Sequence, residues 1–193
     1  MSANFFKLFV FVFLLSNTID VFSQDNSKIY DVNDLSIYQL TSKWKTQENK
    51  TITFQDLEKN TLVMVMMFTS CKLSCPRLVS DIRAIEEEVS ETVKKNIKYI
   101  LISIDPETDT PKVLKDFAIQ NDLVGNQWLL LHGQEKDIRE FANVVAVSYK
   151  EISPINFSHS NIISVFDKKG ELKYQQEGFG NKNTEIVKQI IRL

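Results

Sequence analysis

The sequence LVMVMMFTSCKLSCPR, residues 62–77, decides how this chain folds. Residues 62–68 are all apolar, which is the pattern of a strand buried on both faces. The two cysteines of the chain, Cys71 and Cys75, follow directly. Pro76 favours a helix that begins there, because proline lacks the N–H that the first helical turn leaves unpaired. The stretch therefore predicts a buried strand, a turn that carries both cysteines, and a helix.

The spacing of the two cysteines favours a chemical role. An i,i+4 pair on a helical turn has α-carbons about 6 Å apart, a separation that a disulfide can span. Both sulfurs would lie beside a helix N-terminus, whose partial positive charge stabilises the thiolate that acts as nucleophile and metal ligand. The alternative is that the cysteines are small apolar core residues, and two ligands fall short of the four in a structural zinc site. Their joint position at a strand-to-helix junction favours chemistry.

The remaining hydrophobic patterns predict an α/β fold. Apolar residues recur at helical spacing from Leu78 to Val93, which predicts one long amphipathic helix. Residues 97–104 predict a second buried strand, parallel to the first and joined to it by a right-handed crossover. The elements expected downstream are a helix from Pro111 capped by Asp109 or Thr110, strands at 128–131 and 144–149 around a helix at 134–142, a hairpin of 161–166 and 171–175 with Gly170 in its turn, and a helix at 184–193 with Ile186, Ile190 and Ile191 inward. This order predicts a thioredoxin-like fold, with a central mixed sheet flanked by helices.

Composition and charge restrict the class of protein. A chain of 193 residues with 43% hydrophobic and 25% charged residues is long enough for one packed domain. The formal net charge is -2 with acids and bases intermixed, so nucleic acid is not an expected partner. We expect a monomer.

The N-terminus predicts export. Residues 1–23 contain Lys7, an apolar run at 8–15 and a permitted cut before Gln24, as a secretory signal peptide does. The apolar run is short for a bilayer, so an uncleaved membrane anchor is the alternative. Residues 24–50 would then form an N-terminal extension and residues 51–193 the thioredoxin-like domain. The expected location is the periplasm or cell envelope, with attachment to the inner membrane if the anchor is retained. A cysteine pair in that compartment becomes a disulfide unless a reductant or a metal keeps it reduced.

Three motifs resemble those of a known family. FTSCKLSCPR (68–77), SIDPETDTP (103–111) and SHSNIISVFDKKGEL (158–172) are similar, in this order, to motifs of the Sco/SenC family of copper-binding, thioredoxin-like proteins that assist assembly of cytochrome c oxidase. The resemblance covers about residues 54–179. It implies a copper site, for Cu(I) or Cu(II), with Cys71, Cys75 and His159 as ligands, and the copper-site subunit of cytochrome c oxidase, or another copper protein, as partner.

The chemistry of these residue types agrees with that implication. Copper(I) accepts thiolates, and an imidazole nitrogen suits both oxidation states. One departure is Ser158, because the family often has aspartate before the histidine, and a carboxylate that could orient the imidazole is then missing. His132 has no motif around it and is interpreted as structural. Three methionines of the buried strand, Met64, Met66 and Met67, are interpreted as core residues. The loop that begins at Asp105 is expected to cap the next helix or to support the site.

Two further activities remain open from the sequence. Cys71 and Cys75 could instead reduce a disulfide in a partner protein, with His159 as a tuning group, although thioredoxins use a CxxC ring. A thiol peroxidase fits less well, because it needs an activated peroxidatic cysteine rather than a pair with a histidine. Turnover that survives loss of the histidine would separate a reductase from a copper carrier.

Overall fold

The structure is a computed structural model and describes residues 36–72, 74–153, 156–178 and 183–193. The expected leader at 1–23 and residues 24–35 of the expected extension lie outside these residues. The elements in chain order, with η for a 3-10 helix, are η2 (Ile37–Gln39), β1 (Trp44–Thr46), β2 (Thr51–Ile52), η3 (Phe54–Leu57), β3 (Thr61–Met67), α1 (Cys75–Glu88), α2 (Glu91–Lys94), β4 (Ile97–Ser103), α3 (Pro111–Gln120), β5 (Trp128–His132), α4 (Glu135–Val144), β6 (Tyr149–Ser153), β7 (Asn156–His159), β8 (Ile162–Phe166), β9 (Leu172–Glu177) and α5 (Thr184–Ile191).

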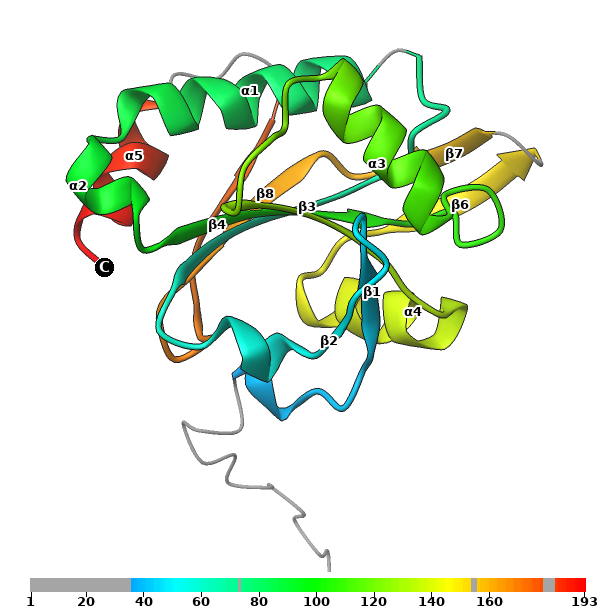
Figure 1. The fold of residues 1–193 in the computed structure, drawn as a ribbon, viewed down its shortest axis with the longest axis horizontal. Coiled ribbons are helices and arrows are strands. Elements are labelled where there is room, and N and C mark those ends of the chain that lie inside the picture. The colour runs from blue at the N-terminus through cyan, green and yellow to red at the C-terminus, as the bar shows by residue number, and fades with distance from the viewer. Residues whose placement is uncertain (1–35, 73, 154–155, 179–182) are drawn as a thin grey trace, which may run out of the picture.

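A mixed sheet forms the centre of the molecule. Seven of the described strands pair in the order β2-β1-β5-β4-β3-β8-β9. β3, β4 and β5 are parallel to one another, and the pairs β3–β8, β8–β9, β5–β1 and β1–β2 are antiparallel. β6 and β7 form a separate hairpin that projects at one end of this sheet (Figure 1). The predicted strand–helix–strand unit and the thioredoxin-like class are confirmed.

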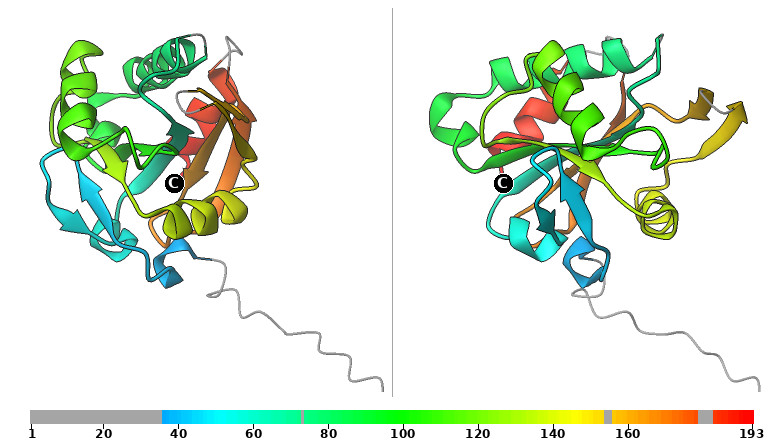
Figure 2. Two further views of the ribbon diagram at one scale, coloured as in Figure 1. Left: turned by 90° about the vertical axis from the view of Figure 1, so that its right-hand side faces the viewer. Right: turned by 45° about the vertical axis from the view of Figure 1, so that its right-hand side comes forward.

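Helices cover both faces of the sheet. Figures 1 and 2 show α1 and α3 on one face and α4 on the opposite face. Every residue of β3 is buried, as the apolar run that begins at Leu62 predicts for a central strand covered on two sides. The methionines of this strand are at most 2% exposed, which confirms their interpretation as core residues. Within the described ranges, no helix has both the length and the apolar character needed to cross a bilayer.

The N-terminal segment contributes to the sheet. β1 pairs with β5 through Lys45 opposite His132 and Thr46 opposite Leu131. The Trp44 side chain is completely buried, with its ring 5.3 Å from that of Phe54. Residues 36–50 are therefore packed into the same core as the strands that follow.

The long helix predicted as far as Val93 is interrupted. α1 ends at Glu88, and Val89 is extended at φ -85° and ψ 135° while its side chain remains buried. Ser90 precedes α2, and its carbonyl accepts the N–H groups of Val93 and Lys94. Serine is favoured at the start of a helix, so the chain can restart there in a new direction without leaving the core.

Two other predictions in the C-terminal half are wrong in detail. The strand predicted at 144–149 begins only at Tyr149, as β6, because α4 continues to Val144 and a turn follows in which Ala146 has φ +51°. Val145 and Val147 are buried in that turn, which produced the alternating apolar pattern. In α5, Ile191 is 54% exposed rather than inward, so the buried stripe ends at Ile190.

The predicted helix cap and hairpin turn are both present. Thr110 caps α3 by accepting the N–H of Val113 at 3.4 Å. Gly170, in the turn between β8 and β9, has φ +77°, a conformation that residues with a Cβ rarely adopt. The Gly170 turn lies at the end of the sheet where β3 begins, because Phe166 pairs with Leu62.

Candidate metal centre

The first cysteine lies in the turn between β3 and α1, and the second begins the helix. Cys71 is partly exposed, whereas Cys75 is completely buried. The backbone N–H of Cys75 donates to Cys71 Sγ at 3.3 Å, and Ser74 Oγ lies 3.1 Å from the same sulfur. Cys71 Sγ therefore occupies the position of a helix cap, where an N–H of the first turn favours negative charge on sulfur.

The second cysteine has a different electrostatic environment. Burial raises the pKa of the Cys75 thiol well above its ordinary value, and the hydrogen bond to the backbone of Phe68 lowers it only in part. Both sulfurs lie at the start of α1, as the sequence predicts, but burial gives Cys75 a raised pKa. Loss of the Cys75 proton in this buried position requires compensation, and a bound cation is one source of it.

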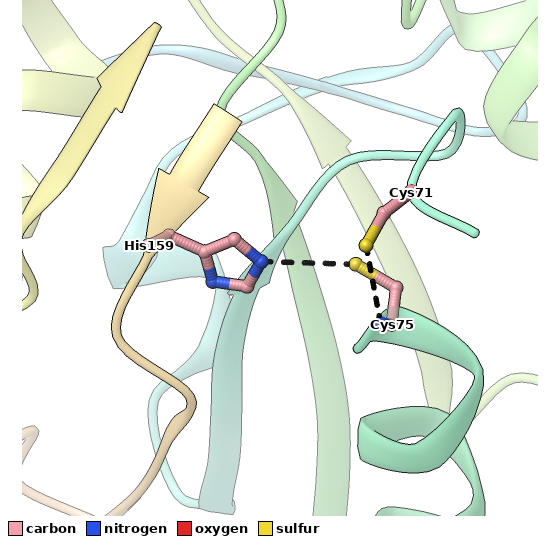
Figure 3. Close-up of side chains that lie close together, drawn as sticks. All are labelled: Cys71, Cys75 and His159. Atoms are coloured by element: carbon pink, nitrogen blue, oxygen red, sulfur yellow. Dashed lines mark hydrogen bonds between the residues drawn. The ribbon is translucent and has the colours of Figure 1, made fainter. Parts of the chain in front are cut away.

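The histidine approaches from the hairpin. His159 is the last residue of β7, rather than part of a loop before β8, and its Nε2 lies 3.8 Å from Cys75 Sγ (Figure 3). Its Nδ1 lies 3.1 Å from the carbonyl oxygen of Ser160. A carbonyl can only accept, so Nδ1 carries the proton and Nε2 presents a lone pair to the sulfurs. Burial lowers the pKa of His159, which favours the neutral ring that a metal needs.

Three ligand atoms converge as the sequence predicts. The two Sγ atoms and a ring nitrogen of His159 all lie within 4.8 Å of one another, and no other such group occurs among the described residues. Figure 3 shows the histidine on one side of the sulfurs and the turn before α1 on the other. Two sulfurs and one imidazole nitrogen are the donor set of a soft or borderline metal ion. The set can hold such an ion.

Aromatic packing holds the histidine in place. The Phe68 ring meets the imidazole of His159 edge to face, with centroids 5.7 Å apart, and packs on Phe157 at 5.2 Å. Phe157 and His159 are two residues apart on β7, so their side chains share one face of the hairpin. Ser158 is exposed and belongs to the opposite face, so it does not support the imidazole.

A buried aspartate fixes the cysteine turn, and the sequence did not indicate this role. Asp109 is completely buried and accepts the backbone N–H of Thr69 at 3.0 Å, the Thr69 hydroxyl, and the Ser103 hydroxyl at 2.6 Å. The sequence predicts Asp109 only as a cap for α3. The available signal was its place in the loop after β4, because the loops after two adjacent parallel strands meet at the same edge of a sheet.

The other histidine is structural, as predicted. His132 Nδ1 lies 3.0 Å from the carbonyl oxygen of Asp109, so it supports the loop after β4 rather than a ligand set. Asp105 does not touch the cysteines through any described hydrogen bond; its Oδ1 accepts the N–H of Thr108 at 3.2 Å.

Comparisons of sequence agree with these observations. Residues 37–193 match the sequence model of the family described as SCO1/SenC. The SCO1 protein homolog of Bacillus subtilis is 29% identical over 101 residues, which are 51% of this chain and 51% of that protein. The matched part therefore spans about half the length of this curated relative.

Solved structures share the fold. A SCO1/SenC family lipoprotein from Bacillus anthracis superposes with a TM-score of 0.73 at 22% identity, covering 81% of this chain and 95% of the other. Arabidopsis thaliana ScoI, solved with copper bound, gives a TM-score of 0.67 at 18% identity over 79% of this chain and 97% of the other.

Proposed function

The chain belongs to the SCO1/SenC family, and from that premise we propose that it is an exported copper-binding metallochaperone. Cys71 Sγ, Cys75 Sγ and His159 Nε2 would bind one copper ion. The recipient would be the copper site of a cytochrome c oxidase subunit or of another copper protein. The observation that supports this most directly is the convergence of these three atoms within 4.8 Å.

The donor set suits copper as cargo. Thiolates bind copper(I) at low coordination number, and the imidazole allows copper(II) to be held as well. Cys71 is partly exposed, so an incoming thiolate from a partner can reach the ion on that side. Transfer then proceeds by exchange of one ligand at a time and needs no change in the oxidation state of copper.

The test is copper binding by the reduced chain. Addition of copper(I) should give about one ion per chain, with sulfur neighbours in X-ray absorption. Cys71→Ser, Cys75→Ser and His159→Ala should each lower the affinity by at least about tenfold, since each removes a ligand. His132→Gln is the matched control, because its imidazole touches a backbone carbonyl instead of the sulfurs. Binding without sulfur neighbours, or unchanged affinity in the cysteine variants, refutes the proposal.

A second candidate activity is reduction of a disulfide in a partner. The unequal exposure of the cysteines supports it, because the partly exposed Cys71 can attack the partner disulfide and the buried Cys75 can then attack Cys71. The Cys71 thiolate would form a mixed disulfide and release one partner thiolate. Cys75, after losing its proton, would then attack Cys71 Sγ and release the second, so two electrons and two protons pass to the partner while Cys71–Cys75 becomes a disulfide.

His159→Ala separates the two activities. Turnover in a disulfide-reduction assay that survives this substitution, while copper affinity is lost, favours the reductase. Loss of both activities favours one copper-centred function. A disulfide assay without turnover in the unmodified reduced chain excludes the reductase.

The location and organisation follow from the same proposal. Residues 1–23 would direct export to the periplasm or cell envelope, and would attach the protein to the inner membrane if they are retained. Residues 24–35 would extend from the thioredoxin-like domain, which includes the paired strand β1 as well as residues 51–193, and the protein would act as a monomer. Cell fractionation together with the N-terminal sequence of the purified protein tests the first point, and sedimentation tests the last.

A further inference from the structure

An apolar groove lies outside the metal centre. It has a volume of about 600 Å³ and is bounded by α3, the loop that follows α3, and the hairpin of β1 and β2. The left view of Figure 2 shows α3 and this hairpin next to each other along one side of the molecule. None of the three candidate copper ligands lines the groove, so copper binding does not use it.

Exposed apolar side chains form one wall of the groove. Ile119, near the end of α3, and Val124, in the loop that follows, both line it, and each is 60% exposed. Trp128 and Leu123 line it as buried residues, at 2% and 1% exposed. Large apolar side chains that stay exposed around a hollow of this size mark a surface that another apolar segment can cover.

The opposite wall is held in place by polar contacts. Gln47, in the turn between β1 and β2, donates from Nε2 to the carbonyl oxygen of Trp128 at 3.0 Å, and its Oε1 accepts the N–H of Leu130 at 2.9 Å. The Glu48 carboxylate contacts Lys115 Nζ on α3 at 2.8 Å. The turn is thus tied to both β5 and α3, so the groove is preformed.

The groove has an excess of positive charge, because three lysines and two acids line it. Lys115 is already in an ion pair, and Asp56 caps the start of η3. Lys98 Nζ donates to the carbonyl oxygen of Asn126 at 2.8 Å. Neither Lys98 nor Lys50 forms an ion pair with a described residue. An acidic occupant would therefore complement the groove.

The N-terminal end of the described chain lies close to the groove. Ser36 and Glu58 line one smaller pocket, and Leu57, the residue before Glu58, lines the groove. The Tyr38 hydroxyl donates to the carbonyl oxygen of Leu57 at 3.3 Å. The residues before Ser36 therefore join the fold beside one end of the groove.

The sequence before Ser36 suits the groove in length and charge. Residues 29–35, IYDVNDL, contain two acids and no base. Fully extended, they span about 23 Å. The 10 residues of α3 extend over about 15 Å, so the segment can run along the groove and still reach Ser36. Its apolar side chains are those of Ile29, Tyr30, Val32 and Leu35.

We propose that residues 29–35 occupy this groove of their own chain. Their apolar side chains then cover Ile119 and Val124. Their aspartates lie near Lys50 and Lys98. Because the segment is tethered, its effective concentration at the groove is high and few contacts suffice. Docking shortens the connection between the expected leader and the domain. What this means for a membrane-attached copper carrier rests on the proposed function, but the docking itself does not.

The test is photo-cross-linking within the full, copper-free chain. A benzophenone amino acid replaces Tyr30 and, on irradiation, captures the C–H groups that it touches. Mass spectrometry should find cross-links within one chain to residues 47–52 or 115–129. Ile119→Asp should lower their yield by about fivefold or more, because an unpaired charge then faces the apolar segment. Ile152→Asp is the matched control, since Ile152 is similarly exposed on β6 outside the groove, and should leave the yield unchanged.

A change of charge gives a second measurement. Lys50→Gln should lower the yield about twofold, whereas Lys136→Gln, the same change on α4 outside the groove, should leave it unchanged. Cross-links that join two chains, or that reach lipid or another protein instead of the groove, overturn the proposal. Equal yields in the groove variants and the controls overturn it as well. Failure of copper binding at the cysteines would leave all of these results unchanged.

Discussion

Two cysteines four residues apart have different chemical surroundings. Cys71 Sγ is partly exposed and accepts an N–H from the first turn of α1, while Cys75 is buried and its pKa is raised. His159 provides the third donor, with its tautomer fixed by the carbonyl of Ser160. At the residue scale, the site therefore consists of one accessible sulfur, one sheltered sulfur and one oriented nitrogen.

This asymmetry predicts the order of alkylation. In the reduced, copper-free chain at pH 8, iodoacetamide should modify Cys71 at least about tenfold faster than Cys75, because only an accessible thiolate reacts. Peptide mass spectrometry at successive times measures both rates. Unfolding in urea is the control and should bring the rates close together. Equal rates in the folded chain would contradict the burial of Cys75.

At the scale of elements, the site depends on loops that follow neighbouring strands. Asp109, in the loop between β4 and α3, accepts three hydrogen bonds from Thr69 and Ser103 and thereby fixes the turn that leads to Cys71. Burial raises the pKa of the Asp109 carboxyl, and the hydrogen bonds from Ser103 and Thr69 oppose that shift only in part. The same aspartate thus positions the turn and carries a cost in stability when it is charged.

The sign of that cost can be tested with Asp109→Asn. Below the ordinary aspartate pKa of about 3.9 the carboxyl is protonated in both the folded and unfolded chains. As the pH rises, the unfolded chain loses its proton first, so the unfolding free energy of the unmodified protein should fall relative to that of the variant until the raised folded pKa is passed. Urea unfolding of both proteins from pH 3 to 7 measures the difference. A difference that is flat, or that grows in favour of the unmodified protein, would contradict the raised pKa.

At the scale of the whole molecule, the metal centre joins segments that are far apart in the chain. The cysteines come from the junction of β3 and α1, and the histidine comes from the end of β7. β7 belongs to the separate hairpin and leads into β8, which pairs with β3 in the central sheet. The N-terminal strand β1 extends that sheet beyond β5. Trp44 anchors β1, with its ring packed between Phe54 and Phe141.

Trp44→Ala should therefore destabilise the entire domain. Removing a completely buried tryptophan should lower the free energy of unfolding by about 3–5 kcal/mol, as measured by urea denaturation. Lys45→Ala, at the exposed neighbouring position, should change it by less than about 0.5 kcal/mol. A loss below about 1 kcal/mol for Trp44→Ala would show that the N-terminal segment is an appendage and not part of the core.

Local patterns in the sequence were sufficient for most of the architecture. The apolar runs at 62–68 and 99–102 predicted the central strands β3 and β4. Pro76, Pro111 and Gly170 have backbone properties that mark the start of a helix or a turn. The pairing of Cys71 with Cys75 is also local, because four residues on a turn stay close in any fold. The resemblance of three motifs then indicated which histidine would join them.

The sequence by itself determined the strand order of the core unit, the cysteine turn and the three residue types of the site. The tertiary structure alone decided that Cys75 is buried while Cys71 is accessible, that Asp109 holds the turn, that the helix breaks at Val89, and that Asp105 Oδ2 is buried with no hydrogen-bond donor among the described residues. The physical reason is how far apart along the chain the interacting residues lie. A turn or an amphipathic face is fixed by neighbours in the chain, whereas burial, a raised pKa and a missing hydrogen-bond partner depend on which distant segments pack together.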